Sequence, residues 1–387
     1  MRSTNWAALR VIELNDLASL EAVRPAWREL LTRIEDDSPY LTPEFMLPWM
    51  RLVRDRYRFR VLAAWDGDHL VGLAPIVERA VGRAGIRIVI RSFPVFGQTP
   101  PFDVMIARRE PEVMRAFVEH WLSSGSWDVM ELADVPSESR TAALLAEALQ
   151  GTGLRLGVTR SKTTYLVPVR KGWPEFLASR PKKFRQNLRR GLRRCKELGT
   201  TRVLRFPGTG MTLAHTIDAT LQVIDRSWKA PTEDRSRWHR FFSDLMAELA
   251  AGGLLSWRCL EVNGEPIASL VELDYRDTVH PFHLAVDLAY QPLSPGLLIL
   301  GDAVRDAHER RYSRLDTGGT ADYLHRWADS TRSFDRLCVV NTSLSSRLKA
   351  HVYRWERRRR LAREERQTEL KKRAKANAAS QANDEDA

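Results

Sequence analysis

HLAVDLAYQPLSPGLLILGDAVRDAHERR (His283–Arg311) is the stretch of sequence that decides the fold. Its first part, residues 283–290, predicts a strand, and after a short loop Ser294, Pro295 and Gly296 open a helix. Proline is favoured in the first helical turn, and glycine lets a ligand approach the backbone closely. The free N–H groups and positive dipole at such a helix start suit a pyrophosphate. An ordinary strand–turn–helix unit capped by Ser294 would give the same pattern, so the stretch alone leaves both interpretations open.

A repeated pattern extends outward from this stretch. Residues 60–79, RVLAAWDGDHLVGLAPIVER, and 257–276, WRCLEVNGEPIASLVELDYR, both alternate apolar and polar residues around an Asp-Gly or Asn-Gly turn. Each predicts a β-hairpin in which glycine supplies the positive φ. The offset of 197 residues also relates the apolar run 86–93 to 283–290. Each half therefore reads helix, hairpin, strand, helix, strand, which favours a duplication over two unrelated α/β domains.

The positive charge is local. The chain of 387 residues has a net charge of +12, and residues 180–205 hold eleven Lys and Arg against Glu197 alone. Within this segment Phe184, Leu188, Leu192, Cys195 and Leu198 fall on one face of a predicted helix at 181–199, opposite a face of Lys and Arg. A second basic segment runs from residue 347 to the C-terminus. Such patches indicate an anionic partner.

Composition and motifs narrow the class of protein. An apolar fraction of 43% is ordinary for a globular protein, and no apolar run is long enough to span a membrane. Three dispersed cysteines without a CxxC, together with an N-terminus that lacks the apolar centre of a secretory signal, predict a cytoplasmic location and no zinc site. The GxGxxG, GxxxxGK[ST], GxSxG and HExxH motifs do not occur.

Several short segments occur in a fixed order: KKFRQNLRRGLRR (182–194), SWK (227–229), NGEPIAS (263–269), AVDLAYQPLSPG (285–296) and LDTGGTADYLHRW (315–327). As a set they resemble the CelD/BcsL-type acetyltransferases, a family of the GNAT superfamily. That family is similar to the FemA/FemX peptidyltransferases in having two tandem halves. The resemblance implies an α/β (α+β) GNAT fold with mixed, mostly antiparallel sheets flanked by helices.

The implied organisation has three parts. Residues 1–160 form a degenerate N-terminal GNAT-like half, because PVFGQTPPFDVM (94–105) offers no Ser-Pro-Gly helix start. Residues 161–345 form the half that binds acyl-CoA and contain the basic helix. Residues 346–387 form a basic helical, partly disordered tail.

The resemblance also implies site residues. The strand at 283–290 splays from its neighbour, the pantetheine arm of acetyl-CoA adds to it, and a backbone N–H there polarises the thioester as an oxyanion hole does. The implied cofactor-binding residues are Tyr290, Ser294, Gly296 and Leu297, and no metal is implied.

Proton transfer needs an acid and a base. Tyr323 is the implied acid, Asp316 a base or substrate ligand, and Asp287 a carboxylate that faces the cleft. Each also has a structural interpretation. Tyr323 could be a packed tyrosine, Asp316 could form the turn before Gly318, and Asp287 could face solvent. The implied substrate-binding residues are Asp103, Trp228, Lys229, His325 and Arg326.

Three functions remain open from sequence. The first is acyl transfer from acyl-CoA to an amine or hydroxyl acceptor, which the resemblance links to cell-envelope or exopolysaccharide chemistry. The second is a Fem-like transferase that uses aminoacyl-tRNA, with the basic helix following phosphates. The third is a non-catalytic GNAT-like module that docks on an anionic membrane surface or RNA through the basic helix and tail.

Overall fold

A computed structural model describes residues 9–35, 38–83, 85–95, 100–169, 172–208, 210–231, 234–355, 359 and 366, without the side chains of Arg83 and Asp322. Within these residues the strands form two sheets. The smaller has the order β1 (Arg10–Leu14), β3 (Val61–Asp66), β4 (His69–Ala74) and β7 (Met105–Ile106).

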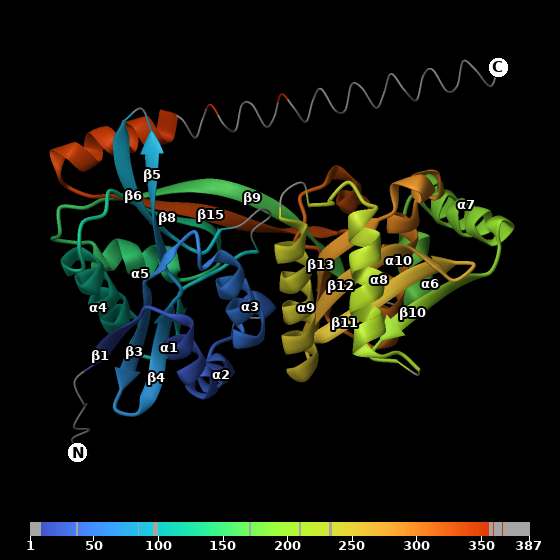
Figure 1. Cartoon of the computed structure of the whole chain (residues 1–387), viewed down its shortest axis with the longest axis horizontal. Coiled ribbons are helices and arrows are strands. Elements are labelled where there is room, and N and C mark those ends of the chain that lie inside the picture. Colours follow the sequence, from blue (N-terminus) through green and yellow to red (C-terminus); the bar gives the residue numbers. More distant parts are fainter. Residues whose placement is uncertain are drawn as a thin grey trace.

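The larger sheet has eleven strands among the described residues and runs through both halves of the molecule (Figure 1). Its order is β10 (Thr201–Phe206), β11 (Leu255–Val262), β12 (Glu265–Tyr275), β13 (Thr278–Val286), β14 (Arg314–Asp316), β9 (Leu156–Pro168), β15 (Ser330–Val340), β8 (Val129–Pro136), β6 (Ile86–Ser92), β5 (Val77–Arg83) and β2 (Arg58–Phe59).

Helices flank both sheets. The first half holds α1 (Leu17–Ala22), α2 (Arg24–Thr32), η1 (Pro39–Leu41), α3 (Pro43–Val53), α4 (Glu110–Ser123) and α5 (Thr141–Ala148). The second half holds α6 (Trp173–Ser179), α7 (Lys182–Leu198), α8 (Leu213–Asp225), α9 (Arg235–Ala251), η2 (Leu288–Leu293), α10 (Pro295–Glu309) and η3 (Asp322–Arg326). The mixed α/β architecture predicted from sequence is confirmed.

Both predicted hairpins are present, as β3–β4 and β11–β12. At the second turn Asn263 and Gly264 both have positive φ, 53° and 80°, as a two-residue hairpin loop with the right-handed strand twist requires. The strand predicted at 283–290 instead ends at Val286, where η2 begins two residues later. Pro292 and the Asp287 cap favour this short 3-10 helix over a continued strand.

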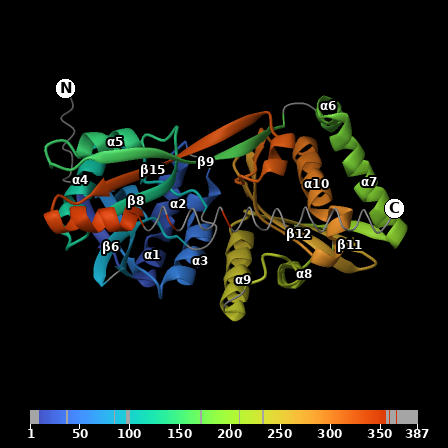
Figure 2. The same cartoon turned by 90° about the horizontal axis from the view of Figure 1, so that it is seen from above.

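Two long strands join the halves. β9 pairs with β15 along most of its length, and its last residues, 166–168, pair with β14 of the second half. β15 follows the second half in sequence but pairs with β8 of the first half. Figures 1 and 2 show both strands passing from one half to the other. The residue boundary proposed at 160/161 thus lies inside β9.

The halves also share a hydrophobic core. Helices α3 and α9, which lead into the two hairpins, pack against each other, with the Trp49 and Phe241 rings 5.5 Å apart. Phe45 of α3 packs against Phe282 of β13, with 5.2 Å between the two ring centroids. One face of the second-half sheet therefore packs on α8, α9 and the first half, and the other packs on α6, α7 and α10.

The basic helix α7 lies beside α10 (Figure 2). Its described buried positions are Phe184, Gly191 and Cys195. A Cβ on Gly191 would lie 3.0 Å from the Leu293 carbonyl oxygen, so glycine allows the helix to approach the start of α10 closely. Leu192 and Leu198, predicted on the apolar face, are 44% and 53% exposed, because the contact with α10 rotates the buried stripe toward Gly191.

The tail begins with ordered contacts. Residues 344–355 are helical, and Ser346 Oγ donates to Asp128 Oδ1 at 2.6 Å while Lys349 Nζ lies 3.1 Å from the same oxygen. The predicted disorder of the tail concerns residues that lie mostly outside the described part of the chain.

A buried group of ions fixes α10 on the sheet. Arg258 of β11 is 2% exposed and binds Glu272 of β12 at 2.6 Å, and it also binds Asp302 of α10 at 2.9 Å. Asp302 is shared with Arg205 of β10 at 2.7 Å. Each buried charge has a partner, which offsets the cost of removing it from water.

Replacing Arg258 with Ala should leave Glu272 and Asp302 buried without their main partner. We expect the free energy of unfolding to fall by about 3–5 kcal/mol, measured by urea denaturation. Replacing the exposed Arg202 of the neighbouring strand with Ala is the control and should change stability by about 0.5 kcal/mol or less. Equal, small effects of both changes would contradict the role of the ion group.

Candidate functional site

The site begins where two parallel strands part. β13 pairs with β14 only through Thr278 with Arg314 and Val279 with Leu315. β13 continues to Val286, so its edge beyond Val279 is unpaired by any strand among the described residues. The N–H and C=O groups of such an edge can bind an extended chain as an added strand.

An irregularity in β13 lies within the unpaired segment. Val271 of β12 pairs with His283, whereas the next residue, Glu272, pairs with Pro281. Phe282 is therefore an extra residue, and such a bulge bends the strand and redirects its side chains. Phe282 packs toward Phe45 and Tyr40 of the first half, and the His283 ring lies 4.7 Å from Phe242 of α9.

Helix α10 starts beyond the open end of this gap. Its N-cap, Ser294, has φ 56°, and the Ser294 side chain makes no capping hydrogen bond. The Leu297 and Leu298 N–H groups both bond to the Ser294 carbonyl. The positive end of the helix is thus not neutralised by a side-chain cap, which leaves it suited to an anion.

The four predicted cofactor-binding residues lie around this helix start. Tyr290 belongs to η2, and its hydroxyl donates to Glu265 Oε2 at 2.7 Å. Leu297 packs on the second-half core. A Cβ on Gly296 would lie 3.3 Å from Val286 Cγ2, so this glycine also permits close packing of α10 on β13.

Asp287 holds the loop that precedes α10. It is 4% exposed, it pairs with Arg226 Nε at 3.1 Å, and Oδ1 accepts from the Ala289 N–H at 2.9 Å. Arg226 also binds Glu265 at 2.6 Å. These contacts tie the end of α8, the β11–β12 turn and η2 together, and they occupy the carboxylate with structural partners.

Asp316 lies at the end of β14, on the other side of the gap. Oδ1 accepts from the Gly318 N–H at 3.0 Å, and Oδ2 lies 3.3 Å from Arg332 Nη1. Tyr40 of the first half approaches the same turn: its hydroxyl lies 3.6 Å from where a Gly318 Cβ would be. Burial raises the pKa of Tyr40, and the Asp316 charge raises it further.

Tyr323, His325 and Arg326 follow in η3. Tyr323 is 45% exposed, and partial burial raises the pKa of its hydroxyl. His325 and Arg326 are exposed, whereas Leu324 and Trp327 pack into the core. The alternation places the three polar side chains on the outer side of the turn after β14.

The loop after α8 brings two predicted substrate-binding residues to β13. Trp228 is 70% exposed, and the Lys229 ammonium lies 5.4 Å from the Trp228 ring centroid. Burial lowers the pKa of Lys229 to about 8. The fifth predicted substrate residue, Asp103, lies in the first half instead, where it accepts from Thr141 Oγ1 at 2.6 Å and from the Val104 N–H at 2.8 Å.

His283 is a residue that sequence reasoning missed. Its Nε2 is buried and has no hydrogen-bond partner among the described residues. Burial holds the pKa of the imidazole well below 6.5, and the charge on Lys229 lowers it further. A neutral imidazole at pH 7 can accept a proton. A single His inside an apolar strand gives no motif, so only the fold reveals its position beside Lys229.

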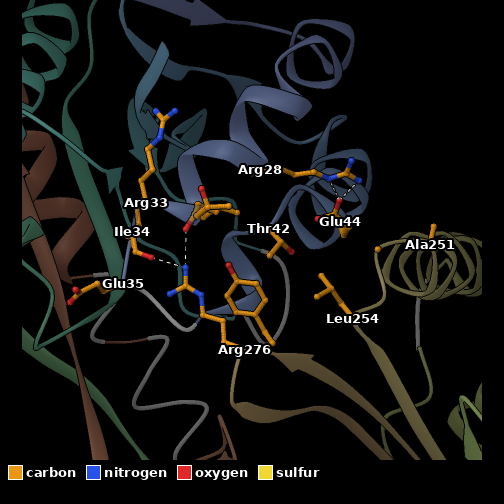
Figure 3. A pocket seen from close by; sticks show the side chains of 13 residues that line it. Arg28, Arg33, Ile34, Glu35, Thr42, Glu44, Ala251, Leu254 and Arg276 are labelled. Carbon is orange, nitrogen blue, oxygen red and sulfur yellow. Dashed lines mark hydrogen bonds and ion pairs between the residues drawn. The ribbon is translucent and has the colours of Figure 1, made fainter.

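Two cavities lie away from these residues. One, of about 1050 Å³, lies between the halves and is lined by α2, the end of α9 and the β12–β13 turn (Figure 3). There Arg276 Nη2 donates to the Leu31 and Ile34 carbonyls at 2.8 and 2.6 Å, and Arg28 pairs with Glu44. The other, of about 810 Å³, lies over β8, β9 and β15. Neither is lined by a predicted site residue.

The residues that the structure describes lack two features. They contain no group of three or more His, Cys, Asp or Glu that could hold a metal ion. They also contain no helix that combines the length and the apolar character needed to cross a membrane.

Comparison with known proteins agrees with this geometry. Residues 182–327 match a family model described as an Acetyltransferase (GNAT) domain, and the match begins with α7 and ends after η3. It therefore includes the parted strands, the start of α10 and the Lys229 loop. A search of the curated proteins found no match.

Solved structures share the fold over most of the chain. FemX matches with a TM-score of 0.56 and 11% identity, covering 86% of this chain and 97% of FemX. A conserved protein of unknown function from Bacteroides thetaiotaomicron matches with a TM-score of 0.52 and 12% identity, and the match covers 86% of this chain and 100% of that one. A third match is the C-terminal domain (DUF2156) of a protein named as a lysylphosphatidylglycerol synthetase from Agrobacterium fabrum. Its TM-score is 0.50 at 12% identity, and the match covers 85% of this chain and 95% of that domain. At these identities the likeness concerns the fold alone.

The Lys229–His283 pair predicts a measurable coupling. Lys229→Met removes a positive charge that disfavours the imidazolium, so the pKa of His283 should rise, while burial still keeps it below 6.5. The titration of the His283 ring protons by NMR, assigned with His283→Gln, measures this shift. Lys182→Met, an exposed lysine of α7, is the control and should leave the pKa unchanged. A pKa of His283 that stays constant or falls in Lys229→Met would contradict the coupling.

Proposed function

We propose that this chain transfers an acyl group, acetyl in the simplest case, from acyl-CoA to an amine or hydroxyl acceptor. The observation that carries the proposal is the parting of β13 from β14 after two residue pairs, with the uncapped start of α10 beyond the open end. The unpaired edge of β13 suits an extended amide-containing arm, and the helix start suits its pyrophosphate.

The backbone of β13 would supply the electrostatic part of catalysis. N–H groups on its unpaired edge can donate to the thioester carbonyl oxygen, where negative charge develops when the acceptor attacks. The bulge at Phe282 supports this role, because it turns the strand locally without removing it from the sheet.

The acceptor would enter from the α8–α9 side of β13. On this side His283 is the base that takes a proton from the attacking amine or hydroxyl. Burial keeps its imidazole neutral by lowering its pKa, and the charge on Lys229 lowers that pKa further. Trp228 and Lys229 line the approach. On the β14 side, Tyr323 remains the proposed acid that protonates the departing thiolate. Asp316 lies on the same side, and Arg332 and the Gly318 N–H hold its carboxylate in place.

A second candidate function is supported by α7. Its exposed cations next to α10 would hold the 3′-phosphate of CoA under the acyl-CoA proposal, but they would equally follow the backbone of a charged tRNA. The fold shared with FemX keeps this Fem-like alternative in view. A role in cell-envelope or exopolysaccharide synthesis is proposed on the sequence resemblance to the CelD/BcsL type.

Ser294 offers a test that spares the fold. Ser294→Asp places a carboxylate at the start of α10, where it should stabilise the helix but repel a pyrophosphate. We expect acetyl-CoA to bind at least about tenfold more weakly, which corresponds to about 1.4 kcal/mol. Ser294→Asn is the matched neutral control, since Asn and Asp both tolerate the positive φ found here. Isothermal calorimetry gives both affinities.

Thermal unfolding with acetyl-CoA tests the donor itself, because a ligand that binds only the folded chain must raise its apparent stability. A wild type that is neither stabilised nor bound by acetyl-CoA would overturn the acyl-CoA proposal. Transfer that requires aminoacyl-tRNA would favour the Fem-like alternative. Equal acetyl-CoA affinities of Ser294→Asp and Ser294→Asn would place the pyrophosphate elsewhere.

A further inference from the structure

Large apolar side chains are exposed along one border of the second half. Leu192 and Leu198 of α7 are 44% and 53% exposed, Leu288 at the start of η2 is 49% exposed, and Trp228 is 70% exposed. We call these four residues, together with the exposed cations of α7, the apolar–basic rim. The cations are Lys182, Lys183, Arg189, Arg190, Arg193, Arg194 and Lys196.

The segments that carry the rim are contiguous. The Leu288 N–H donates to the Arg226 carbonyl at 3.1 Å, which joins η2 to the Trp228 loop. Gly191 of α7 lies against the Leu293 carbonyl at the other end of η2. Asn263 Nδ2 donates to the Leu198 carbonyl at 3.1 Å and so ties the end of α7 to the β11–β12 turn.

The same turn closes the connection. Glu265 binds both Arg226 and the Tyr290 hydroxyl, so the turn, the Trp228 loop and η2 are held together. Figures 1 and 2 show α7 at the outer end of the second half, beside α10. The rim is therefore one border around the start of α10, and not four unrelated exposed residues.

Charge on the rim is not balanced by neighbouring acids. Within the described residues the α7 cations make one ion pair, Arg193 with Glu197 at 3.3 Å, and both partners are well exposed. Such a pair contributes little. The remaining positive charge favours an anionic partner.

We propose that the apolar–basic rim docks on the surface of an anionic lipid bilayer. Cations near an anionic bilayer surface and apolar side chains that enter its interfacial layer act together in such docking. Leucine side chains gain nothing on a nucleic-acid backbone, and Trp228 is the one exposed aromatic ring of the rim, which is too few for a base-stacking platform. Charge and exposed leucines together therefore favour lipid over RNA.

Docking in this way would place the Trp228–Lys229 loop and the gap between β13 and β14 close to the bilayer. The acceptor would then be a lipid-linked amine or hydroxyl compound presented at the surface. This statement about the acceptor rests on the proposed function, whereas the docking itself does not.

The test uses the full-length chain and sedimentation with two kinds of vesicle, phosphatidylcholine alone and phosphatidylcholine with phosphatidylglycerol. We expect binding only to the anionic vesicles. Replacing Arg189, Arg190, Arg193 and Arg194 with Gln should weaken it at least about tenfold. Leu192→Ser with Leu198→Ser should weaken it several-fold, and the weakening should persist at high salt, which screens charge but not apolar contact.

A control that removes one charge fewer changes three exposed arginines outside the rim, Arg155, Arg347 and Arg354, to Gln. This variant should bind anionic vesicles within about twofold of the wild type, and all variants should keep the wild-type melting temperature within a few degrees.

Four results would overturn the proposal: no binding of the wild type to anionic vesicles, an equal loss in the control, no effect of the two leucine changes, or binding to polyuridylate RNA in place of vesicles. Stabilisation by acetyl-CoA is measured separately in the same preparations. A wild type that binds acetyl-CoA but not the anionic vesicles contradicts only the lipid inference. A wild type that binds the anionic vesicles but not acetyl-CoA contradicts only the proposed function.

Discussion

The backbones of β13 and β14 part after Val279 and Leu315, and the candidate site depends on that separation. Hydrogen bonds from one strand to the next would otherwise use every donor on the β13 edge. The separation persists because each strand has another partner: β12 holds β13, and β9 holds β14. β12 and β9 are both long, so each holds its neighbour on the sheet while the edges of β13 and β14 that face each other stay apart.

The two halves are coupled through the same sheet. β9 crosses from the first half to reach β14, and β15 returns to pair with β8. The first half thereby brings Tyr40 to the turn after Asp316 and Phe45 against Phe282. The first half therefore contributes two aromatic side chains to the region around β13 and the turn after β14. Its own carboxylate Asp103, by contrast, is used internally with Thr141.

Local rules account for what sequence could predict. The Asn263-Gly264 turn and the Pro295-Gly296 helix start depend on residues close in the chain, and both are present. The predicted strand end at Tyr290 is wrong, since β13 ends at Val286. The Asp287–Arg226 ion pair, which holds the chain after this strand, joins distant segments and depends on the tertiary fold. The path of β15 into the first half is a pairing between distant segments, which periodicity does not encode. His283 likewise became visible only when the fold placed it beside Lys229 and Phe242.

Charges in this protein follow two opposite arrangements around α10. Beneath the helix, Arg258 is buried against Glu272 and Asp302, and this pairing holds α10 in one position on the sheet. Beside its start, Arg189, Arg190, Arg193 and Arg194 of α7 are exposed, and in the described part of the chain one of them, Arg193, pairs with an acid, Glu197. A helix start can bind an anion well only if it does not move, since an ordering cost would be subtracted from the affinity. The buried ions hold α10 against the sheet. Under the two proposals, the exposed cations would attract the ligand or surface to the start of that helix.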